Sequence, residues 1–280
     1  MNYGLTIFVT EYAMPATDLA REAEARGFES LWFPEHTHIP VSRATPFPGG
    51  GDLPKHYYDT FDPFVTLGAC AAVTKTLKLG SGIALVIQRD PIVLAKEIAT
   101  LDRISNGRAL VGIGGGWNVE EMANHGTAFG NRWKVLRERV EAMKAIWTQE
   151  KAEYHGETVD FDPIFSWPKP VQQPHPPIIL GAHGAKGIAR VVRYCQGWIP
   201  IGAFTDVERD LARLREAARE AGRDPNGIEV SVFGAPGDAD VLRKYKEIGV
   251  ARAVFGLPSE GADRLMPMLD RYGELAREVG

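Results

Sequence analysis

Residues 77–118 read LKLGSGIALVIQRDPIVLAKEIATLDRISNGRALVGIGGGWN, and this stretch contains a complete strand–helix–strand unit. The apolar run over residues 77–86 predicts a buried strand. Residues 91–104 have helical periodicity, start with a proline and are followed by Ser-Asn-Gly, which is typical of a helix end. Residues 108–113 form a second apolar run. Strands that alternate with helices in this way predict a parallel sheet covered on both faces.

The same alternation continues along the whole chain. Strands are predicted over residues 3–9, 30–34, 77–86, 108–113, 177–180, 198–201, 228–233 and 251–255, and helices over residues 15–26, 63–74, 91–104, 132–147, 186–194, 206–221, 238–248 and 261–279. Eight strand–helix units within 280 residues are typical of a (β/α)8 or TIM barrel. We therefore predict an α/β fold with one barrel domain over residues 1–280.

Two long segments interrupt this alternation. Residues 37–61 are rich in proline and glycine and follow the second predicted strand. A loop of this length at the catalytic end of a barrel predicts a lid or a substrate wall, and the alternative is a flexible loop without function. Residues 151–176 precede the fifth predicted strand, and the sequence around Gly156 predicts a small hairpin with a structural role.

Composition excludes several classes of protein. The chain has 44% hydrophobic and 24% charged residues with a net charge of −4, which argues against disorder. It has no apolar run long enough for a membrane span and no basic block of the kind that binds nucleic acid. Cys70 and Cys195 lie in apolar helical patterns and predict buried free thiols in a reducing compartment. No signal peptide is expected, and a cytoplasmic location is predicted.

Candidate functional residues follow the predicted strands, because the active site of a TIM barrel lies at the carboxyl ends of its strands. Glu35 and His36 end the second strand, where an imidazole can act as acid or base; the alternative is a rim histidine bonded to the loop backbone. Glycine-rich turns follow the fourth and fifth strands, and their backbone N–H groups can approach an anion closely. Lys186 is the charged candidate beside the second turn, although tight turns are also common without a ligand.

Glycines inside the third predicted strand, at positions 80 and 82, are unusual. Glycine in a strand often marks a bulge or a ligand that approaches the backbone, and the alternative is close packing against a large inner side chain. A metal hydrolase that uses His36, His38 and His183 is a further alternative. No additional histidine or aspartate follows the sixth and eighth strands, so a metal is not expected.

Four stretches together resemble a known family. They are FDPFVTL at 61–67, LKLGSGI at 77–83, DPIVLAKEIATLDRISNGR at 90–108 and GIGGGWNVEE at 112–121. They are similar to the bacterial luciferase-like oxidoreductases, which use a flavin or a deazaflavin, and most similar to the short members that use coenzyme F420. Further matches occur at Arg132, in the proline-rich segment 168–178 and at Gly197-Trp198.

The resemblance implies an oxidoreductase on a (β/α)8 barrel that transfers a hydride between F420 and a small organic substrate. An FMN-dependent monooxygenase on the same scaffold is the alternative, and a non-catalytic ligand-binding protein is a more distant one. Glu35 and His36 correspond to the family's catalytic acid–histidine pair. A non-prolyl cis peptide is implied at Gly82–Ile83. The residues implied to bind the cofactor are Ser81, Gly82, Ile83, Gly114, Gly115, Gly116, Trp117, Gly181, Ala182, His183, Gly184 and Gly202.

The chain also departs from the family pattern. Trp117 stands where some deazaflavin enzymes have a catalytic glutamate, and Gln196 stands where many relatives have aspartate. The polyanionic tail of F420 would favour the nearby basic residues Arg43, Lys55 or Arg89, whereas a pocket mouth without basic residues would favour FMN. The resemblance further implies a homodimer formed through the second and third helices, with no nucleic-acid or membrane partner.

Overall fold

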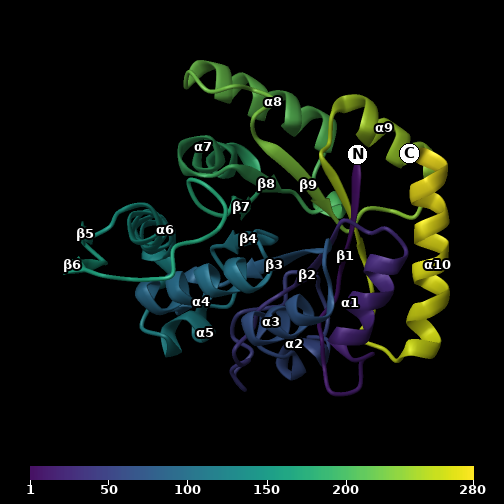
Figure 1. The fold of residues 1–280 in the computed structure, drawn as a ribbon, viewed down its shortest axis with the longest axis horizontal. Coiled ribbons are helices and arrows are strands. Elements are labelled where there is room, and N and C mark those ends of the chain that lie inside the picture. The colour runs from purple at the N-terminus through teal and green to yellow at the C-terminus, as the bar shows by residue number, and fades with distance from the viewer.

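Eight parallel strands form a closed barrel in the computed structural model, which describes residues 1–280. The barrel strands are β1 (Asn2–Thr6), β2 (Ser30–Phe33), β3 (Lys78–Ala84), β4 (Ala109–Gly114), β7 (Ile178–Gly181), β8 (Gly197–Ile199), β9 (Glu229–Phe233) and β10 (Arg252–Gly256). Each strand pairs with the barrel strand before it in the chain, and β10 pairs with β1 to close the barrel. The predicted (β/α)8 fold is therefore confirmed (Figure 1).

A helix follows each strand and covers the outside of the barrel (Figure 1). These helices are α1 (Ala16–Ala25), α3 (Pro63–Val73), α4 (Pro91–Ile104), α6 (Arg132–Thr148), α7 (Gly184–Tyr194), α8 (Val207–Glu220), α9 (Ala239–Ile248) and α10 (Ala262–Val279). Aspartates begin several of them. Asp90 Oδ1, for example, accepts hydrogen bonds from the backbone N–H groups of Ile92 and Val93 at 2.9 Å, which satisfies donors that have no partner inside α4.

Three features differ from the sequence-based expectation or refine it. The third strand ends at Ala84, not at residue 86, because residues Val86–Gln88 form a 3-10 turn. Two short helices were not expected, α2 (His56–Asp59) within the loop 37–61 and α5 (Val119–Asn124) after β4. The hairpin around Gly156 is confirmed as the antiparallel pair β5 (Ala152–His155) and β6 (Asp160–Ile164).

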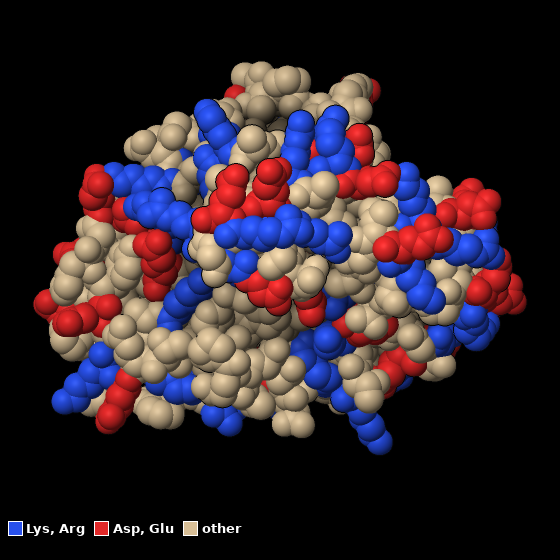
Figure 2. Space-filling model, turned by 90° about the horizontal axis from the view of Figure 1, so that it is seen from above, with Lys and Arg blue, Asp and Glu red and all other residues tan.

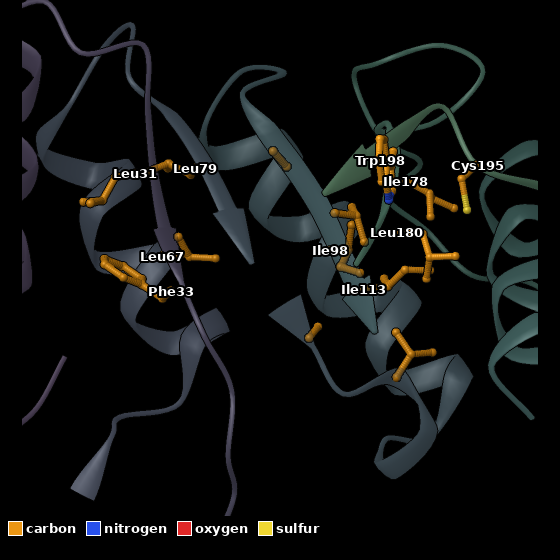
Figure 3. Close-up of a cluster of buried hydrophobic side chains, with 14 of the residues drawn as sticks. Leu31, Phe33, Leu67, Leu79, Ile98, Ile113, Ile178, Leu180, Cys195 and Trp198 are labelled. Carbon is orange, nitrogen blue, oxygen red and sulfur yellow. The ribbon is translucent and has the colours of Figure 1, made fainter. Parts of the chain in front are cut away.

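The main hydrophobic core lies between the barrel strands and the surrounding helices and contains 61 buried residues. Figure 3 shows part of it, with Leu67 of α3 near Leu31, Phe33 and Leu79 of the strands. A second, smaller cluster lies inside the barrel and consists of Trp32, Leu110, Ile179, Ile199, Phe233 and Val254. Large side chains therefore fill the middle of the barrel, and it is not a channel.

The amino-terminal end of the barrel is closed by a buried ion pair. Arg252 is 1% exposed, and its guanidinium donates to both carboxylate oxygens of Glu29 at 2.6 Å and to Ser231 Oγ at 2.8 Å. Burial acts to raise the pKa of Glu29, but the hydrogen bonds and charge of Arg252 outweigh it and hold the pKa at about 2. We call Glu29, Ser231 and Arg252 the lower charge cluster.

The surface adds two observations. The face seen in Figure 2, which includes α7, α8 and α9, carries acidic side chains between the basic ones. This face therefore has no continuous basic surface of the kind that binds nucleic acid. Among the helices, none combines the length and the apolar character that crossing a bilayer requires.

Candidate active site

A pocket of about 700 Å³ opens at the carboxyl ends of the barrel strands, a volume within the usual range for small-molecule sites. The ends of β2, β3, β4 and β7 contribute most of the residues that the sequence singled out. Those that line it are Glu35, His36, Gly82, Ile83, Gly114, Gly115, Gly116, Trp117, Gly181, Ala182 and His183. Most of the residues that line the pocket were therefore identified from the sequence.

Glycines at the ends of β4 and β7 accommodate two of the side chains that line this pocket. A Cβ atom on Gly114 would lie 2.6 Å from Ile83 Cδ1, and one on Gly181 would lie 3.2 Å from Ile83 Cγ2. A Cβ atom on Gly115 would lie 2.8 Å from the indole ring of Trp133. Larger residues at these positions would displace Ile83 and Trp133, which line the pocket themselves.

The two glycines of β3 have different roles. A Cβ atom on Gly80 would lie 2.2 Å from the Trp32 ring, so close packing against an inner side chain explains that glycine. Gly82 lies where the β3–β4 register shifts between Ser81 and Ala84. The bond between Gly82 and Ile83 is a cis peptide, as the family resemblance implied. A Cβ atom on Gly82 would also lie 2.8 Å from the Phe233 ring, so the packing interpretation is correct at both positions and the bulge interpretation at Gly82.

His36 forms a buried pair with a carboxylate that the sequence analysis did not identify. Its Nδ1 atom lies 3.0 Å from Oε2 and 3.1 Å from Oε1 of Glu121, and the two side chains are 7% and 2% exposed. Because a carboxylate only accepts hydrogen bonds, Nδ1 carries the proton in this pair. The Nε2 atom makes no hydrogen bond within the protein, so it is available for a ligand in the pocket.

Glu121 reaches His36 because α5 begins next to the pocket. Asn118 Oδ1 accepts a hydrogen bond from the backbone N–H of Glu121 at 3.0 Å and fixes the first turn of α5. Trp117 occupies the position where some deazaflavin enzymes carry glutamate. In this chain the carboxylate beside His36 belongs to Glu121, four residues further along. The sequence signal was Asn-Val-Glu-Glu, an N-cap followed by acidic residues, but the proximity to His36 depends on the tertiary structure.

Glu35 lies beside His36 in sequence but is bonded differently. Its Oε2 accepts from the backbone N–H of Leu85 at 2.6 Å, and its Oε1 accepts from Arg89 Nε at 2.6 Å. Arg89 also pairs with Asp62 and, at 3.1 Å, with Glu97. Glu35 thus holds the chain that follows β3, and its oxygens are engaged in these bonds.

The loop 37–61 supplies an aromatic wall. The Tyr57 ring centroid lies 5.3 Å from that of His36, and the Trp117 centroid lies 6.0 Å from it. Phe47 packs edge-on against both Tyr57 and Trp117. The expected substrate wall is consistent with this arrangement, since Pro48 and Tyr57 line the pocket directly.

The β7 side of the pocket contains the start of α7. His183 is the N-cap residue and gives no side-chain cap to the helix, so the first N–H groups of α7 are free to bind an anion. Burial lowers the pKa of His183. Trp198 Nε1 donates to the carbonyl of Ala182 at 2.8 Å and fixes this turn.

Three of the expected cofactor residues do not line the pocket. Ser81 is buried, and its hydroxyl donates to the Gly112 carbonyl at 2.8 Å, which ties β3 to β4 next to the bulge. Gly184 has a φ of 67° and begins α7, and Gly202 lies in the 3-10 turn Gly202–Phe204. The lining residues that sequence reasoning did not single out as cofactor or catalytic residues are Phe8, Pro34, Pro48, Tyr57, Leu85, Trp133, Ile201 and Phe204.

The basic residues expected at the pocket mouth are placed differently. Arg89 is in the buried network with Glu35, which corrects the expectation that it could meet an anionic tail. Lys55 pairs with Asp59 at 3.1 Å. Arg43 lies over the Trp117 ring at 5.9 Å. Burial was the property that the sequence could not reveal for Arg89.

The histidines considered as metal ligands do not converge. His38 contacts Thr37 and Asn124, and His183 contacts Thr205 at 3.3 Å. No group of three or more His, Cys, Asp or Glu side chains is arranged to hold a metal ion. The metal-hydrolase alternative therefore has no assembled ligand set in this structure.

Comparison with known proteins gives the family. The family model described as luciferase-like monooxygenase matches residues 9–253. An uncharacterized protein of Mycobacterium tuberculosis is 43% identical over 277 residues, which cover 97% of each chain. Among solved structures, the monooxygenase RslO1 from Streptomyces bottropensis has a TM-score of 0.80 at 20% identity and 99% coverage of both chains. The coenzyme F420-dependent tetrahydromethanopterin reductase from Methanopyrus kandleri has a TM-score of 0.79 at 19% identity over the full length of both.

The two solved structures share the barrel, and the family model covers the strand ends that build the pocket, from β2 to β9. The protein is an enzyme of the oxidoreductase or monooxygenase type, and the chain belongs to the luciferase-like monooxygenase family.

Proposed function

We propose that this protein transfers a hydride between coenzyme F420 and a small organic substrate, and that His36 exchanges the accompanying proton with the substrate. The observation that carries the proposal is the His36–Glu121 pair, which lies in the same pocket as the β3 bulge at Gly82 and Ile83. A proton-transfer group therefore lies close to a surface on which a flat ring can rest.

The residues present fit such a cofactor. The glycines at the ends of β4 and β7 let Ile83 pack against them, where a Cβ atom would collide with its side chain, and all three residues line the pocket. The uncapped start of α7 and the turn 114–116 offer backbone N–H groups to a phosphate. A deazaflavin bound there would supply the redox chemistry, and the protein would supply binding, orientation and proton transfer.

The protein's own groups account for the proton step. Glu121 holds Nδ1–H of His36, so Nε2 presents a lone pair to the pocket. That atom can accept the proton of a substrate hydroxyl during oxidation, and the imidazolium that forms is stabilised by the Glu121 carboxylate. In the reverse direction the same atom returns the proton. Tyr57 and Trp117 line the pocket beside the ring of His36 and would limit the access of water to it.

An FMN-dependent monooxygenase is the second candidate. Both cofactors carry a ribityl phosphate, and the glycine turns and α7 would hold that phosphate in either case. The two candidates differ in the electron acceptor and in the need for oxygen, and fluorescence titration with F420 and with FMN separates them. We expect binding of F420, abolished catalysis in His36→Ala and retained cofactor binding in that variant. Binding of FMN alone would establish the second candidate, and binding of neither would refute both.

A homodimer is proposed on the outer face of α3 and α4. Val65, Val93 and Ile104 are 76%, 56% and 57% exposed there, and a second copy of the chain would bury them. Light scattering after size exclusion should give twice the mass of the chain. The charged double variant Val65→Asp and Val93→Asp should give a monomer.

A further inference from the structure

A groove of about 590 Å³ is lined by residues of α6 and α7, two neighbouring helices on the outside of the barrel (Figure 1). Its lining consists of Trp133, Lys134, Arg137, Glu157, Lys186, Ala189, Arg190, Arg193 and Tyr194. Five of these residues are basic and one is acidic. We call it the basic groove.

Part of this positive charge has no carboxylate partner. Lys134 pairs with Glu157, and Arg137 lies 3.4 Å from Glu138 and 3.8 Å from Glu141. Lys186, Arg190 and Arg193 form no ion pair, although all three lie on α7 at a spacing that places them on one face. Like charges at this spacing destabilise a helix, so an anion bound in the groove would relieve their repulsion.

The groove is next to the pocket because Trp133 lines both. The Trp133 ring packs on Gly115, and the guanidinium carbon of Arg190 lies 4.2 Å from its centroid. Arg132 lies over the same ring at 5.4 Å. One indole ring therefore separates the glycine turn after β4 from the unpaired arginine of α7.

A neutral hydrogen-bonding group lies in the same groove. Tyr194 is 7% exposed, and its hydroxyl has no hydrogen-bond partner although it is buried. Such a group is usually satisfied in a native protein. The hydroxyl is enclosed by protein, so the ligand contacts come from the three cations without a carboxylate partner, which suit a ligand that carries several carboxylates.

We propose that the basic groove binds the oligoglutamyl tail of F420, with Lys186, Arg190 and Arg193 as the main contacts. This inference rests on the proposed function, because the deazaflavin ring would occupy the adjacent pocket. It assigns the tail to α7 instead of to Arg43, Lys55 or Arg89. FMN ends at its phosphate, so the groove would contribute nothing to FMN binding and would favour F420 over FMN.

The experiment measures the dissociation constant by fluorescence for three forms of the cofactor, with a long glutamyl tail, with one glutamate and with none. For the unmodified protein we expect the long-tail form to bind roughly tenfold more tightly than the tailless form, since exposed ion pairs each contribute modestly. In about 1 M salt, where the Debye length is only about 3 Å, this preference should disappear.

The variant Arg190→Gln, Arg193→Gln should lose most of the preference for the long tail and bind the tailless form as before. The matched control Arg21→Gln, Arg219→Gln removes two exposed charges from other helices and should keep the preference. The tail-length and salt series on the unmodified protein test the inference even where the variant folds poorly.

The outcomes separate the two proposals. If all three forms of F420 bind equally tightly, the proposed function stands and the basic groove is not the tail site. The same holds if the α7 variant keeps the tail preference of the unmodified protein. If no form of F420 binds and FMN does, the proposed function and this inference both fail.

Discussion

The two ends of the barrel each contain a carboxylate that is hydrogen-bonded to a buried Arg or His side chain, and the two pairs differ in what they leave free. In the lower charge cluster, Arg252 directs its donors at Glu29 and Ser231. At the other end, Glu121 engages only Nδ1 of His36, and Nε2 faces the pocket. In the first arrangement the donors are satisfied within the protein, whereas in the second the Nε2 atom of His36 remains available to a substrate.

The inward-facing side chains follow the same division. Arg252, Trp32 and Phe233 fill the barrel from its amino-terminal end to its middle. At the carboxyl end the inward positions at Gly114 and Gly181 have no side chain, and Ile83 alone reaches between them. The fold is stabilised at one end and left open for binding at the other, as expected for a TIM barrel. The following variants test this division.

The largest effect is expected for His36→Asn. Loss of a general acid–base group lowers the rate by about 10²–10⁴-fold, while the free energy of unfolding should change little because the asparagine amide N–H can donate to Glu121 in place of Nδ1–H. Steady-state rates with F420 and thermal unfolding measure the two quantities. A variant with full activity would contradict the proton-transfer role of His36.

Glu29→Gln should affect stability and not the active site. Removing the carboxylate leaves buried Arg252 with only the exposed Glu229, at 3.7 Å, as a charge partner, and breaking a buried ion pair costs up to about 3–5 kcal/mol of unfolding free energy. Cofactor affinity should stay unchanged. Denaturant unfolding gives the first value and fluorescence titration the second, and the double variant Glu29→Gln, Arg252→Met should recover part of the lost stability. A change in cofactor affinity without loss of stability would refute the division between the two ends.

Glu121→Gln should reduce the rate less than loss of His36 itself, by about 10–100-fold, as is typical when a group that orients a functional histidine is removed. Steady-state kcat and thermal unfolding of the same preparation check this, because a positioning role lowers kcat without a matching loss of stability. A variant with an unchanged kcat, or one whose loss of rate follows its loss of stability, would contradict the positioning role of Glu121.

The smallest effect concerns acid stability at the amino-terminal end. Burial acts to raise the pKa of Glu24, but hydrogen bonds from the N–H groups of Thr76, Leu77 and Lys75 outweigh it and hold the pKa at about 2, below the ordinary 4.5. Its contribution to stability is therefore complete above pH 4.5 and is lost as the pH falls toward 2. The stability difference between the unmodified protein and Glu24→Gln should shrink over this interval in denaturant titrations. A constant difference would show that the Glu24 carboxylate is not specially stabilised.

The barrel could be predicted from the sequence because strand and helix periods are local properties. Gly114, Gly181 and the bulge at Gly82 could be placed for the same reason, since each directly follows or interrupts an apolar run. Glu121 could not be paired with His36, because the two residues are 85 positions apart and α5 has only six residues.

Charge partners were also beyond the reach of the sequence. Nothing in the sequence distinguishes the surroundings of Arg89 from those of Arg190. In the structure Arg89 is enclosed by Glu35 and Glu97, whereas Arg190 lies in the basic groove without a carboxylate partner. Only the packing of helices against strands decides which cation is neutralised. For this reason we propose that α7, and not the loops after β2 and β3, contacts the tail of the cofactor.

A crystal structure with F420 bound tests the central claim most directly. The account predicts density for the deazaflavin ring against Ile83, with the substrate face of the ring toward His36 and the phosphate at the start of α7. Density for the cofactor at any other place, with the pocket between Ile83 and His36 filled by protein side chains, would contradict it.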